Sequence, residues 1–374
     1  MRGTIPDLRV INSLQDTDKQ QWNACFSGEV ENYDYLLAIE ESALTGFLFR
    51  YLTAWSGRAL QSATPMFLTD YSLDTTLQGF GRTLTSRIKN AFPKLLTLKL
   101  ACIGSPCTEC GVIGFHPQLD EQEKRALIAE MLICFETYAQ SRSCHLLGIK
   151  DIPEPFQRRF GDRFQNVKFS TVPGMPTASL DIDFASIDEY LRRLSARTRK
   201  DMRRKLCSFD GLRIEYRSNI DDVLAKIMTL YHDTRKRSEW QFEELTPGYF
   251  QGVLARMPER SFCALYYAGD QLLAANLLIH DKRTLIDKFF CMNGEQGRAY
   301  NLYFLSWFTN IRYCLERGFT RYQSGQAYYE NKLRLGSRLT RNMMYFKHRN
   351  SLAHGLLTFA APLFSADETL KKSA

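Results

Sequence analysis

Residues 301–336 read NLYFLSWFTNIRYCLERGFTRYQSGQAYYENKLRLG, and this stretch decides the fold. Apolar side chains recur at helical spacing over residues 300–317, and Gly318 is placed to end that helix in a left-handed conformation. The segment FTRYQSGQ then reads as a strand, followed by a short helix over residues 328–335. A long helix that leads into a strand and a second helix predicts layers of helix packed on a sheet.

The segments around this stretch alternate strands and helices in the same way. The apolar segments SFCALYYAG, QLLAANLLIH and TLIDKFFCMN lie within residues 261–293 and are separated by short turns, which predicts an antiparallel meander. They are preceded by strand ASLDIDF, a helix capped by Ser186, strand LRIEYRS and a helix over 221–237, and they are followed by strand TRNMMYFKHR. This order predicts a mixed, mostly antiparallel sheet flanked by helices, of the α/β (α+β) class.

The first half of the chain also alternates predicted strands and helices. Strands are expected at LRVINS, LLTLKLACIG and HLLGIKD, helices over 18–25, 33–45 and 121–140, and a β-hairpin over 47–69. Prolines and an absence of helical period between residues 152 and 176 predict a linker or crossover there. We therefore divide the chain into a first domain over 1–175, a second over 176–350 and a C-terminal tail over 351–374.

Composition is that of an ordinary soluble protein. The chain has 374 residues, 44% of them hydrophobic and 24% charged, a size that favours two domains. No apolar run approaches the ~20 residues that span a membrane. The N-terminus has no signal-peptide pattern, so we expect a cytoplasmic protein whose 10 cysteines are mostly reduced.

The net charge of +8 is concentrated on one segment. Residues 192–205 read RRLSARTRKDMRRK, with eight basic residues against one acidic residue. A solvated helix face, a reader of an anionic acceptor and a contact for a tRNA acceptor stem are all compatible with this segment. No aromatic residues interleave the run, which weakens the nucleic-acid reading.

Several motifs resemble those of the FemAB-like acyltransferases of the GNAT superfamily. The helix end Glu316-Arg317-Gly318, the pair Tyr329 and Lys332, and the flanking Gly325 and Gly336 follow that group's pattern. The basic segment LSARTRKDMRRKL resembles the helix that opens its second domain. The likeness is good over about 170–350, and AWSGRALQSATPMFL and CIGSPCTECGVIGF resemble its degenerate first domain.

The resemblance implies two tandem GNAT-like domains, of which the second is catalytic. It also implies an N-acyltransferase that moves an acyl group from an acyl-CoA thioester (acetyl-CoA, for example) to the amine of a small molecule, by direct attack. An aminoacyl-tRNA-dependent transferase of the Fem type is the first alternative. A non-catalytic binding module with a GNAT-like fold is the second alternative.

The resemblance places the donor's pyrophosphate in the loop before the long helix, at a helix N-terminus that offers backbone N–H groups. The expected contacts are Gly294, Gln296, Gly297, Arg298, Ala299 and Asn301. Ala299 and Asn301 replace glycines of the family pattern, and a loop without a ligand is the plain alternative.

Four residues are candidates for the chemistry: His232, Tyr329, Lys332 and Glu244. As a histidine, His232 could act as general base, and the resemblance places Glu244, with Glu239 and Glu243, in a loop that borders the acceptor. A tyrosine could protonate the leaving thiolate, and Lys332 could contact a phosphate or carboxylate. Each also has a purely structural reading, and transfer can proceed by proximity without a protein base.

A metal site is the least favoured reading of the cysteines. Cys102, Cys107 and Cys110 have the spacing of an iron–sulfur loop, with Cys134 as a fourth ligand, or with His116 or Cys144 completing a zinc site. Cys134 falls on a helical apolar pattern, where it should face the core. We expect no metal.

Overall fold

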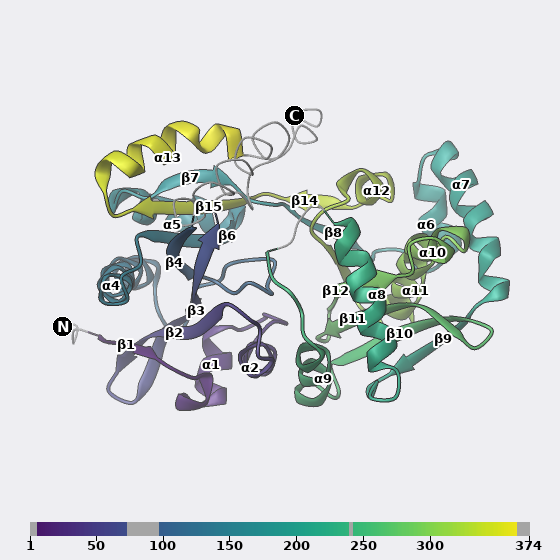
Figure 1. Cartoon of the computed structure of the whole chain (residues 1–374), viewed down its shortest axis with the longest axis horizontal. Helices are drawn as coiled ribbons and strands as arrows, with labels where there is room; N and C mark the ends of the chain where they lie inside the picture. Colours follow the sequence, from purple (N-terminus) through teal and green to yellow (C-terminus); the bar gives the residue numbers. More distant parts are fainter. Residues whose placement is uncertain (1–5, 73–96, 239–241, 365–374) are drawn as a thin grey trace.

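The computed structural model describes residues 6–72, 97–238 and 242–364, and it contains two mixed sheets (Figure 1). The first sheet has the order β1-β2-β3-β4-β6-β15-β7, with β5 paired to β3. Its strands are β1 (Asp7–Ile11), β2 (Phe47–Ser56), β3 (Ala59–Ser72), β4 (Thr97–Ile103), β5 (Gly114–Phe115), β6 (Leu146–Pro153), β7 (Ser170–Pro173) and β15 (Asn342–His348). β4 and β6 run parallel, and the other neighbours are antiparallel.

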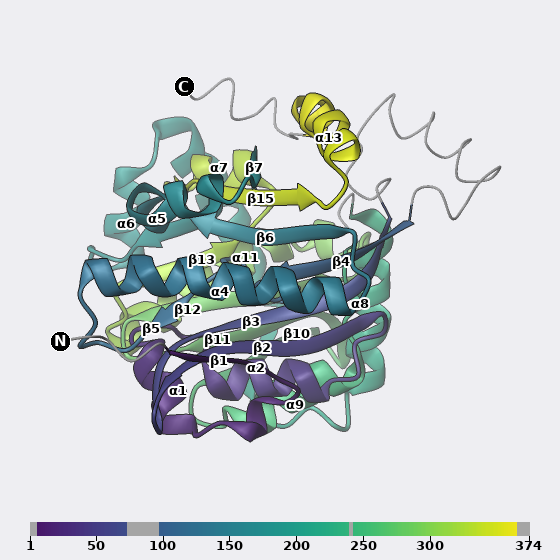
Figure 2. The same ribbon diagram turned by 90° about the vertical axis from the view of Figure 1, so that its left-hand side faces the viewer.

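Helices α4 (Glu121–Ser141) and α5 (Glu154–Asn166) cover one face of the first sheet, and Figure 2 shows α4 lying across its strands. Phe135 of α4 and Phe160 and Phe164 of α5 are buried there. Asp120 and Glu123 close a capping box at the start of α4. This face is therefore a filled core, and the opposite face is the one that turns toward the second sheet.

The second sheet has the order β14-β8-β13-β12-β11-β10-β9. Its strands are β8 (Thr177–Asp181), β9 (Arg213–Arg217), β10 (Ser261–Ala268), β11 (Gln271–His280), β12 (Thr284–Met292), β13 (Arg321–Gly325) and β14 (Arg338–Thr340). One face packs against α6 (Ile187–Arg193), α7 (Ala196–Leu206) and α11 (Leu302–Arg317), and the other against α8 (Leu224–Arg237) and α9 (Pro247–Arg256). β12 and β13 run parallel.

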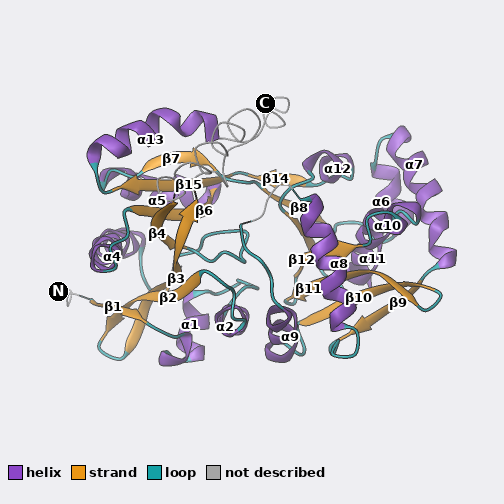
Figure 3. Ribbon diagram, viewed as in Figure 1, coloured by secondary structure: helices purple, strands orange, loops and turns teal. Residues whose placement is uncertain are grey.

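The two halves share a core. Short helices α1 (Lys19–Cys25) and α2 (Tyr33–Glu41) cover part of the inner face of the first sheet, and α2 packs on α9. The hydroxyl groups of Tyr35 and Tyr249 are 2.9 Å apart in this buried contact. Figure 3 shows loops filling the space between the two groups of strands. The remaining elements are η1 (Leu14–Asp16), η4 (Cys207–Gly211), α10 (Gln296–Ala299), α12 (Tyr329–Arg334) and α13 (Ser351–Phe364).

The hairpin, the meander and the long helix confirm the expected α/β class, and Gly318 ends α11 with φ 69°. The segment 152–176, predicted as a linker or crossover, contains a crossover in which α5 connects β6 to β7 of the first sheet, and only the expected lack of a helix there was wrong. Pro153 caps that helix and Pro155 stands in its first turn, where proline is tolerated, so the prolines begin a helix rather than prevent one.

The chain returns to the first sheet near its end. β15 inserts between β6 and β7, and α13 packs on β15 and β7. The expected 176–350 unit thus gives its last strand to the first sheet, and most of the expected tail is a helix. None of the helices in the described part of the chain is both long and apolar enough to cross a membrane.

The loop between β4 and β5 is held tightly at Gly111. Its amide donates to the Asp151 carbonyl at 2.9 Å, and an added Cβ would lie only 1.9 Å from the Lys150 carbonyl oxygen. A side chain here would therefore push the loop off the end of β6.

We expect Gly111→Ala to lower the free energy of unfolding by about 1–3 kcal/mol, measured by urea denaturation, because the methyl group overlaps backbone atoms. Gly355→Ala on α13 is the control, since nothing lies within 4 Å of its added Cβ. Its stability should stay equal or rise slightly. Equal stability of Gly111→Ala and the native chain would contradict the tight packing.

Candidate functional site

The parallel strands β12 and β13 pair over three residue pairs only, ending at Ile286 and Gln323. Beyond them lies an opening that we call the strand gap. A β-bulge in β12 accompanies it: Asp287 pairs with Leu278 of β11, and Phe289 with Leu277, which leaves Lys288 as the extra residue. A bulge bends its strand, so it helps β12 to part from β13.

The bulge also turns Lys288 toward the first half of the chain. Its ammonium is bonded to the Glu31 carboxylate and donates to the Cys107 carbonyl at 2.9 Å. The side chain is 3% exposed. Burial acts to lower the pKa of Lys288, but the charges of Glu31, Tyr249 and Glu109 and the bond to Glu31 together raise it. Lys288 is therefore a charged contact between the two halves.

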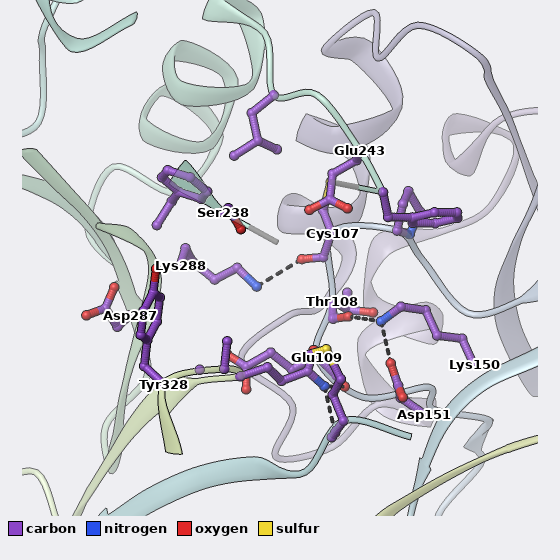
Figure 4. Close-up of a pocket in the computed structure, with 18 of the residues that line it drawn as sticks. Cys107, Thr108, Glu109, Lys150, Asp151, Ser238, Glu243, Asp287, Lys288 and Tyr328 are labelled. Atoms are coloured by element: carbon purple, nitrogen blue, oxygen red, sulfur yellow. Dashed lines mark hydrogen bonds and ion pairs between the residues drawn. The ribbon is translucent and has the colours of Figure 1, made fainter. Parts of the chain in front are cut away.

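A cavity of about 830 Å³ extends from the strand gap to the inner face of the first sheet. Most of its lining is apolar, but ten charged side chains among the described residues face it: the acidic Glu109, Asp151, Glu243 and Asp287 and the basic Lys150, Arg235, Arg237, Lys288, Arg298 and Lys332. Figure 4 shows Glu243 beside the loop Cys107–Glu109, with Asp287 and Lys288 on one side and Lys150 and Asp151 on the other. Buried charges of this density are typical of a functional site.

Asp287 stands at the first position beyond the paired part of β12. Its Oδ2 atom accepts hydrogen bonds from Asn276 at 3.1 Å, Asn310 at 3.3 Å and the Tyr322 hydroxyl at 3.1 Å. Burial raises the pKa of Asp287 to about 6, and these bonds oppose the rise. The network holds this carboxylate rigidly at the floor of the strand gap.

Lys332 projects from α12 into the same place and is 4% exposed. Its ammonium donates to the carbonyls of Gly325 and Gln326, both at 2.9 Å. Burial lowers the pKa of Lys332, and the Glu109 and Asp287 carboxylates oppose that shift. A lysine in this environment can exchange its proton near neutral pH.

Glu109 reaches the strand gap from the first half, on the loop seated by Gly111. Its Oε2 atom accepts from Gln323 at 3.1 Å, and its carbonyl accepts from Gln326 at 3.1 Å. Burial raises the pKa of Glu109 toward neutrality, and Lys288 opposes that rise.

These groups surround one point. Gly325 has φ 82°, and an added Cβ there would lie 3.4 Å from Glu109 Oε1 and 3.9 Å from Lys332 Nζ. The Asp287 carbonyl oxygen is 3.7 Å from the same point. Glycine leaves this point open, so a small group in the strand gap would meet a carboxylate and an ammonium together.

The backbone around the cavity holds uncommon conformations. Ala327 and Tyr328 have φ 62° and 52°, and Asn301 has φ 56°, all left-handed and none glycine. Such residues cost of order 1–3 kcal/mol each and cluster at functional sites. Tyr328 lines the cavity (Figure 4) and is 66% exposed.

The first turn of α11 also borders the cavity. The amides of Phe304 and Leu305 both donate to the Asn301 carbonyl, so those of Leu302 and Tyr303 precede the first helical hydrogen bonds. The buried Tyr303 hydroxyl has no hydrogen-bond partner among the described residues. Arg237 and Arg298 line the same part of the cavity. This end of the cavity suits an anionic carrier.

The loop expected to bind pyrophosphate is folded on itself. The Gly294 amide donates to Asp233, the Glu295 and Gln296 amides to the Asn293 side chain, and the next amides to carbonyls of the same turn. The sequence 296–299 forms α10 instead of an open loop. Of the six expected donor contacts, Gly294, Gln296, Gly297, Arg298, Ala299 and Asn301, only Arg298 lines the cavity.

The four expected catalytic residues are not brought together. Lys332 lies in the strand gap, and the buried Tyr329 hydroxyl donates to the Pro176 carbonyl at 2.8 Å. His232 and Glu244 stand 3.8 Å apart with 48% and 54% of their side chains exposed, and neither lines the cavity. Glu239 lies outside the described residues.

Two sequence signals for the site were missed. Asp287 and Lys288 interrupt the otherwise apolar strand TLIDKFFCM, and Lys150 and Asp151 end the apolar strand HLLGIKD. Ionised residues within buried strands are rare without a role, so such pairs mark a site. Glu109 carries no comparable signal, because it lies in an irregular loop.

The cysteine loop shows no metal geometry. Among the residues placed by the structure, no three His, Cys, Asp or Glu side chains converge as ligands. Cys102, Cys107 and Cys110 are free thiols, and burial raises the pKa of each.

Comparison with known proteins assigns the chain to a family. A FemAB-like family model, described as peptidoglycan biosynthesis/recognition, matches residues 13–359. The chain belongs to the FemAB-like family. The enzyme class expected from the sequence, an acyltransferase, is the class of this family.

Solved structures of FemAB-like and GNAT type have the same fold. The structure of FemX superimposes with a TM-score of 0.60 at 14% identity and covers 94% of this chain and 100% of its own. A tandem GNAT protein from the clavulanic acid biosynthesis pathway gives a TM-score of 0.53 at 11% identity, covering 92% of this chain and 99% of its own. The expected tandem GNAT-like fold is therefore confirmed.

Two strains of Mycobacterium tuberculosis have curated relatives named as 8-amino-7-oxononanoate synthase 2. They are 21% identical to the FemAB-like chain over 339 residues, which is 86% of this chain. The chain spans 42% of the length of these relatives.

We expect Lys288→Met to lower the free energy of unfolding by about 3–5 kcal/mol, because it leaves Glu31 buried without its cation. Denaturant titration measures the loss, and the double variant Lys288→Met/Glu31→Leu should recover much of it. Arg9→Met is the control, since Arg9 and Asp7 form an exposed, solvent-screened pair whose loss should barely change the free energy of unfolding. Equal losses in the single and double variants would refute the interdomain role of this pair.

Proposed function

We propose that this chain is an N-acyltransferase that holds the donor's carbonyl group in the strand gap and receives the amine acceptor from the first half of the cavity. The observation that carries this proposal is the convergence of Glu109, Lys332 and the Asp287 carbonyl on the open point at Gly325. A base and an acid on either side of one carbonyl would assist acyl transfer to an amine, and this point has both.

In the proposed reaction the amine nitrogen attacks the carbonyl carbon directly. The new C–N bond forms, and Glu109 takes the proton that the nitrogen releases. The carbon–sulfur bond then breaks, and Lys332 gives a proton to the departing thiolate. The products are an amide and a free thiol, and no covalent enzyme intermediate forms.

The environments of the two groups suit these roles. A general base works best when its pKa lies near the working pH, and burial moves Glu109 in that direction. Burial moves the pKa of Lys332 down toward neutrality, so that its proton is transferable. Before transfer, the Lys332 ammonium also lies where it can stabilise negative charge on the carbonyl oxygen.

An acyl-CoA thioester is the donor we favour. Its phosphates would lie at the first turn of α11 beside Arg237 and Arg298, and the Tyr303 hydroxyl could donate a hydrogen bond to the carrier. Acyl-CoA is a cytoplasmic metabolite, so the proposed reaction belongs in the cytoplasm.

An aminoacyl-tRNA donor is the second candidate, and helix α7 favours it. Arg197, Lys200, Arg203 and Arg204 are exposed on α7. Lys205 lies 3.5 Å from the centre of the Phe304 ring in the first turn of α11. A phosphate backbone bound along α7 would therefore bring its 3′ end to the donor region.

The acceptor is the amine of a small molecule. The family description, peptidoglycan biosynthesis/recognition, makes amino groups of peptidoglycan precursors one class to assay. To bind an anionic acceptor, the basic face of α7 would have to face the end of the cavity that receives the acceptor. It lies instead beside α11, at the donor end.

We expect a bell-shaped dependence of kcat on pH. The rate should rise as Glu109 loses its proton, at a pH above the ordinary carboxylate value of 4.5. It should fall as Lys332 loses its proton, at a pH below the ordinary lysine value of 10.5. Glu109→Gln should lower kcat by about 100-fold or more and remove the rising limb.

Glu130→Gln, on the exposed face of α4, is the matched control and should keep native kinetics. His232→Ala tests the base expected from the sequence. A loss of the rising limb in His232→Ala, with native behaviour of Glu109→Gln, would contradict the proposed mechanism.

Coenzyme A should raise the melting temperature of the protein, because a ligand that binds only the folded state stabilises it. Arg298→Glu should weaken that shift by placing a negative charge beside the phosphates, whereas Lys282→Glu, in an exposed turn, should not. If coenzyme A gives no shift and ribonuclease abolishes transfer, the donor is an aminoacyl-tRNA.

A further inference from the structure

The first-half end of the cavity is apolar. We define the apolar strip by its lining residues Phe67, Leu100, Cys102, Leu146, Gly148 and Leu357. We propose that the apolar strip binds the hydrophobic part of an amphiphilic primary amine, and that this amine is the acyl acceptor. The inference rests on the proposed function and names its substrate class.

Strand register builds the floor of the apolar strip. Leu100 and Cys102 of β4 pair with Leu146 and Gly148 of β6, so their side chains share one face. The intervening residues belong to the core beneath α4. A Cβ on Gly148 would lie 3.0 Å from Cys102 Sγ and 3.3 Å from Leu100 Cδ1. The absence of a side chain at Gly148 therefore leaves room above the strands for a ligand.

The second half supplies the roof. Phe242 reaches across from the loop before α9, and its ring centre lies 5.4 Å from that of Phe47 and 6.0 Å from that of Phe67. Leu357 of α13 packs against the same cluster. An apolar space closed by both halves forms only in the assembled protein.

A polar belt separates the apolar strip from the strand gap. Lys150 follows Gly148 by two residues on the same face of β6, about 7 Å further along the strand. Its ammonium pairs with Asp151 at 2.8 Å and donates to the Thr108 carbonyl at 2.6 Å. Glu243 faces the belt from the second half, and Glu109 ends it at the strand gap.

The belt has acceptors to spare for an ammonium group. Its carboxylates Glu109, Asp151 and Glu243 lie near the Lys150 ammonium, and Glu109 also faces Lys288 and Lys332. Asp151 is 4% exposed, and its buried Oδ1 atom lacks a hydrogen-bond partner in the described part of the chain. Asp151 also holds φ 45°, a strained conformation at a residue that lines the cavity.

Because the polar belt lies between the strand gap and the apolar strip, the apolar strip suits the acceptor better than the donor. An acyl chain on the donor would have to pass through the ionised belt to reach the strip, which costs desolvation of several charges. An amine with an apolar tail instead places its ammonium in the belt and its tail in the strip. Once the ammonium has released one proton to water, its nitrogen faces the strand gap, where Glu109 takes the second proton as the C–N bond forms.

The test uses dansylcadaverine, a fluorescent primary amine with an aromatic tail, titrated into the full chain. We expect its fluorescence to rise on binding and dodecylamine to displace it. Butylamine should compete at least about tenfold more weakly, since each buried methylene group is worth about fourfold in affinity. Dodecanoate and lysine should compete poorly, because they lack the ammonium or the tail.

Two substitutions on α13 make a matched pair. Leu357→Trp fills the apolar strip and should weaken dansylcadaverine binding about tenfold or more. Leu356→Trp changes the neighbouring residue, whose side chain is 72% exposed, and should leave binding unchanged. Equal effects of the two variants, or competition by dodecanoate as strong as that by dodecylamine, would overturn the inference.

Measuring transfer rates distinguishes a failure of this inference from a failure of the proposed function. Transfer to butylamine and dodecylamine with equal KM would overturn the apolar strip as an acceptor site and leave the N-acyltransferase standing. Tight binding of dansylcadaverine without transfer from any donor would support the amine site and contradict the proposed function.

Discussion

The structure depends on the early end of pairing between β12 and β13. Three residue pairs join these parallel strands, and the bulge at Lys288 then bends β12 away. Beyond the bulge, β12 still pairs with β11, but its other edge faces the cavity instead of β13. Every feature of the proposed site, including the burial of Lys332 and the reach of Glu109, requires that opening.

The two halves complete one site rather than two. One face of the first sheet lines the cavity, and the loop between β4 and β5 of that sheet places Glu109 in the strand gap of the second sheet. Lys288 links the halves by a buried charge pair with Glu31, and the shared apolar core around Tyr35 and Tyr249 holds them together. In the proposed mechanism, a base from one half and an acid from the other meet at a position that neither half could build alone.

Periodic segments were predictable from the sequence, and the site largely was not. The meander, α4 and α11 follow from apolar spacing and from Gly318, because these signals are local. The pairing of β15 with the first sheet is a long-range contact that no local pattern specifies. Lys332 was named from its motif and lies in the strand gap, but Glu109 reaches the gap from the other half of the chain, and its environment exists only after folding.

The most direct measurement of the central claim is a crystal structure of the chain with a non-hydrolysable bisubstrate analogue, coenzyme A joined to an alkylamine through an acetyl linker. We expect the linker carbonyl to lie in the strand gap within hydrogen-bond distance of Lys332. The amide nitrogen should face Glu109 and the alkyl chain should lie on the apolar strip. A carbonyl bound elsewhere, with β12 and β13 paired beyond Ile286 and Gln323, would contradict the proposed function.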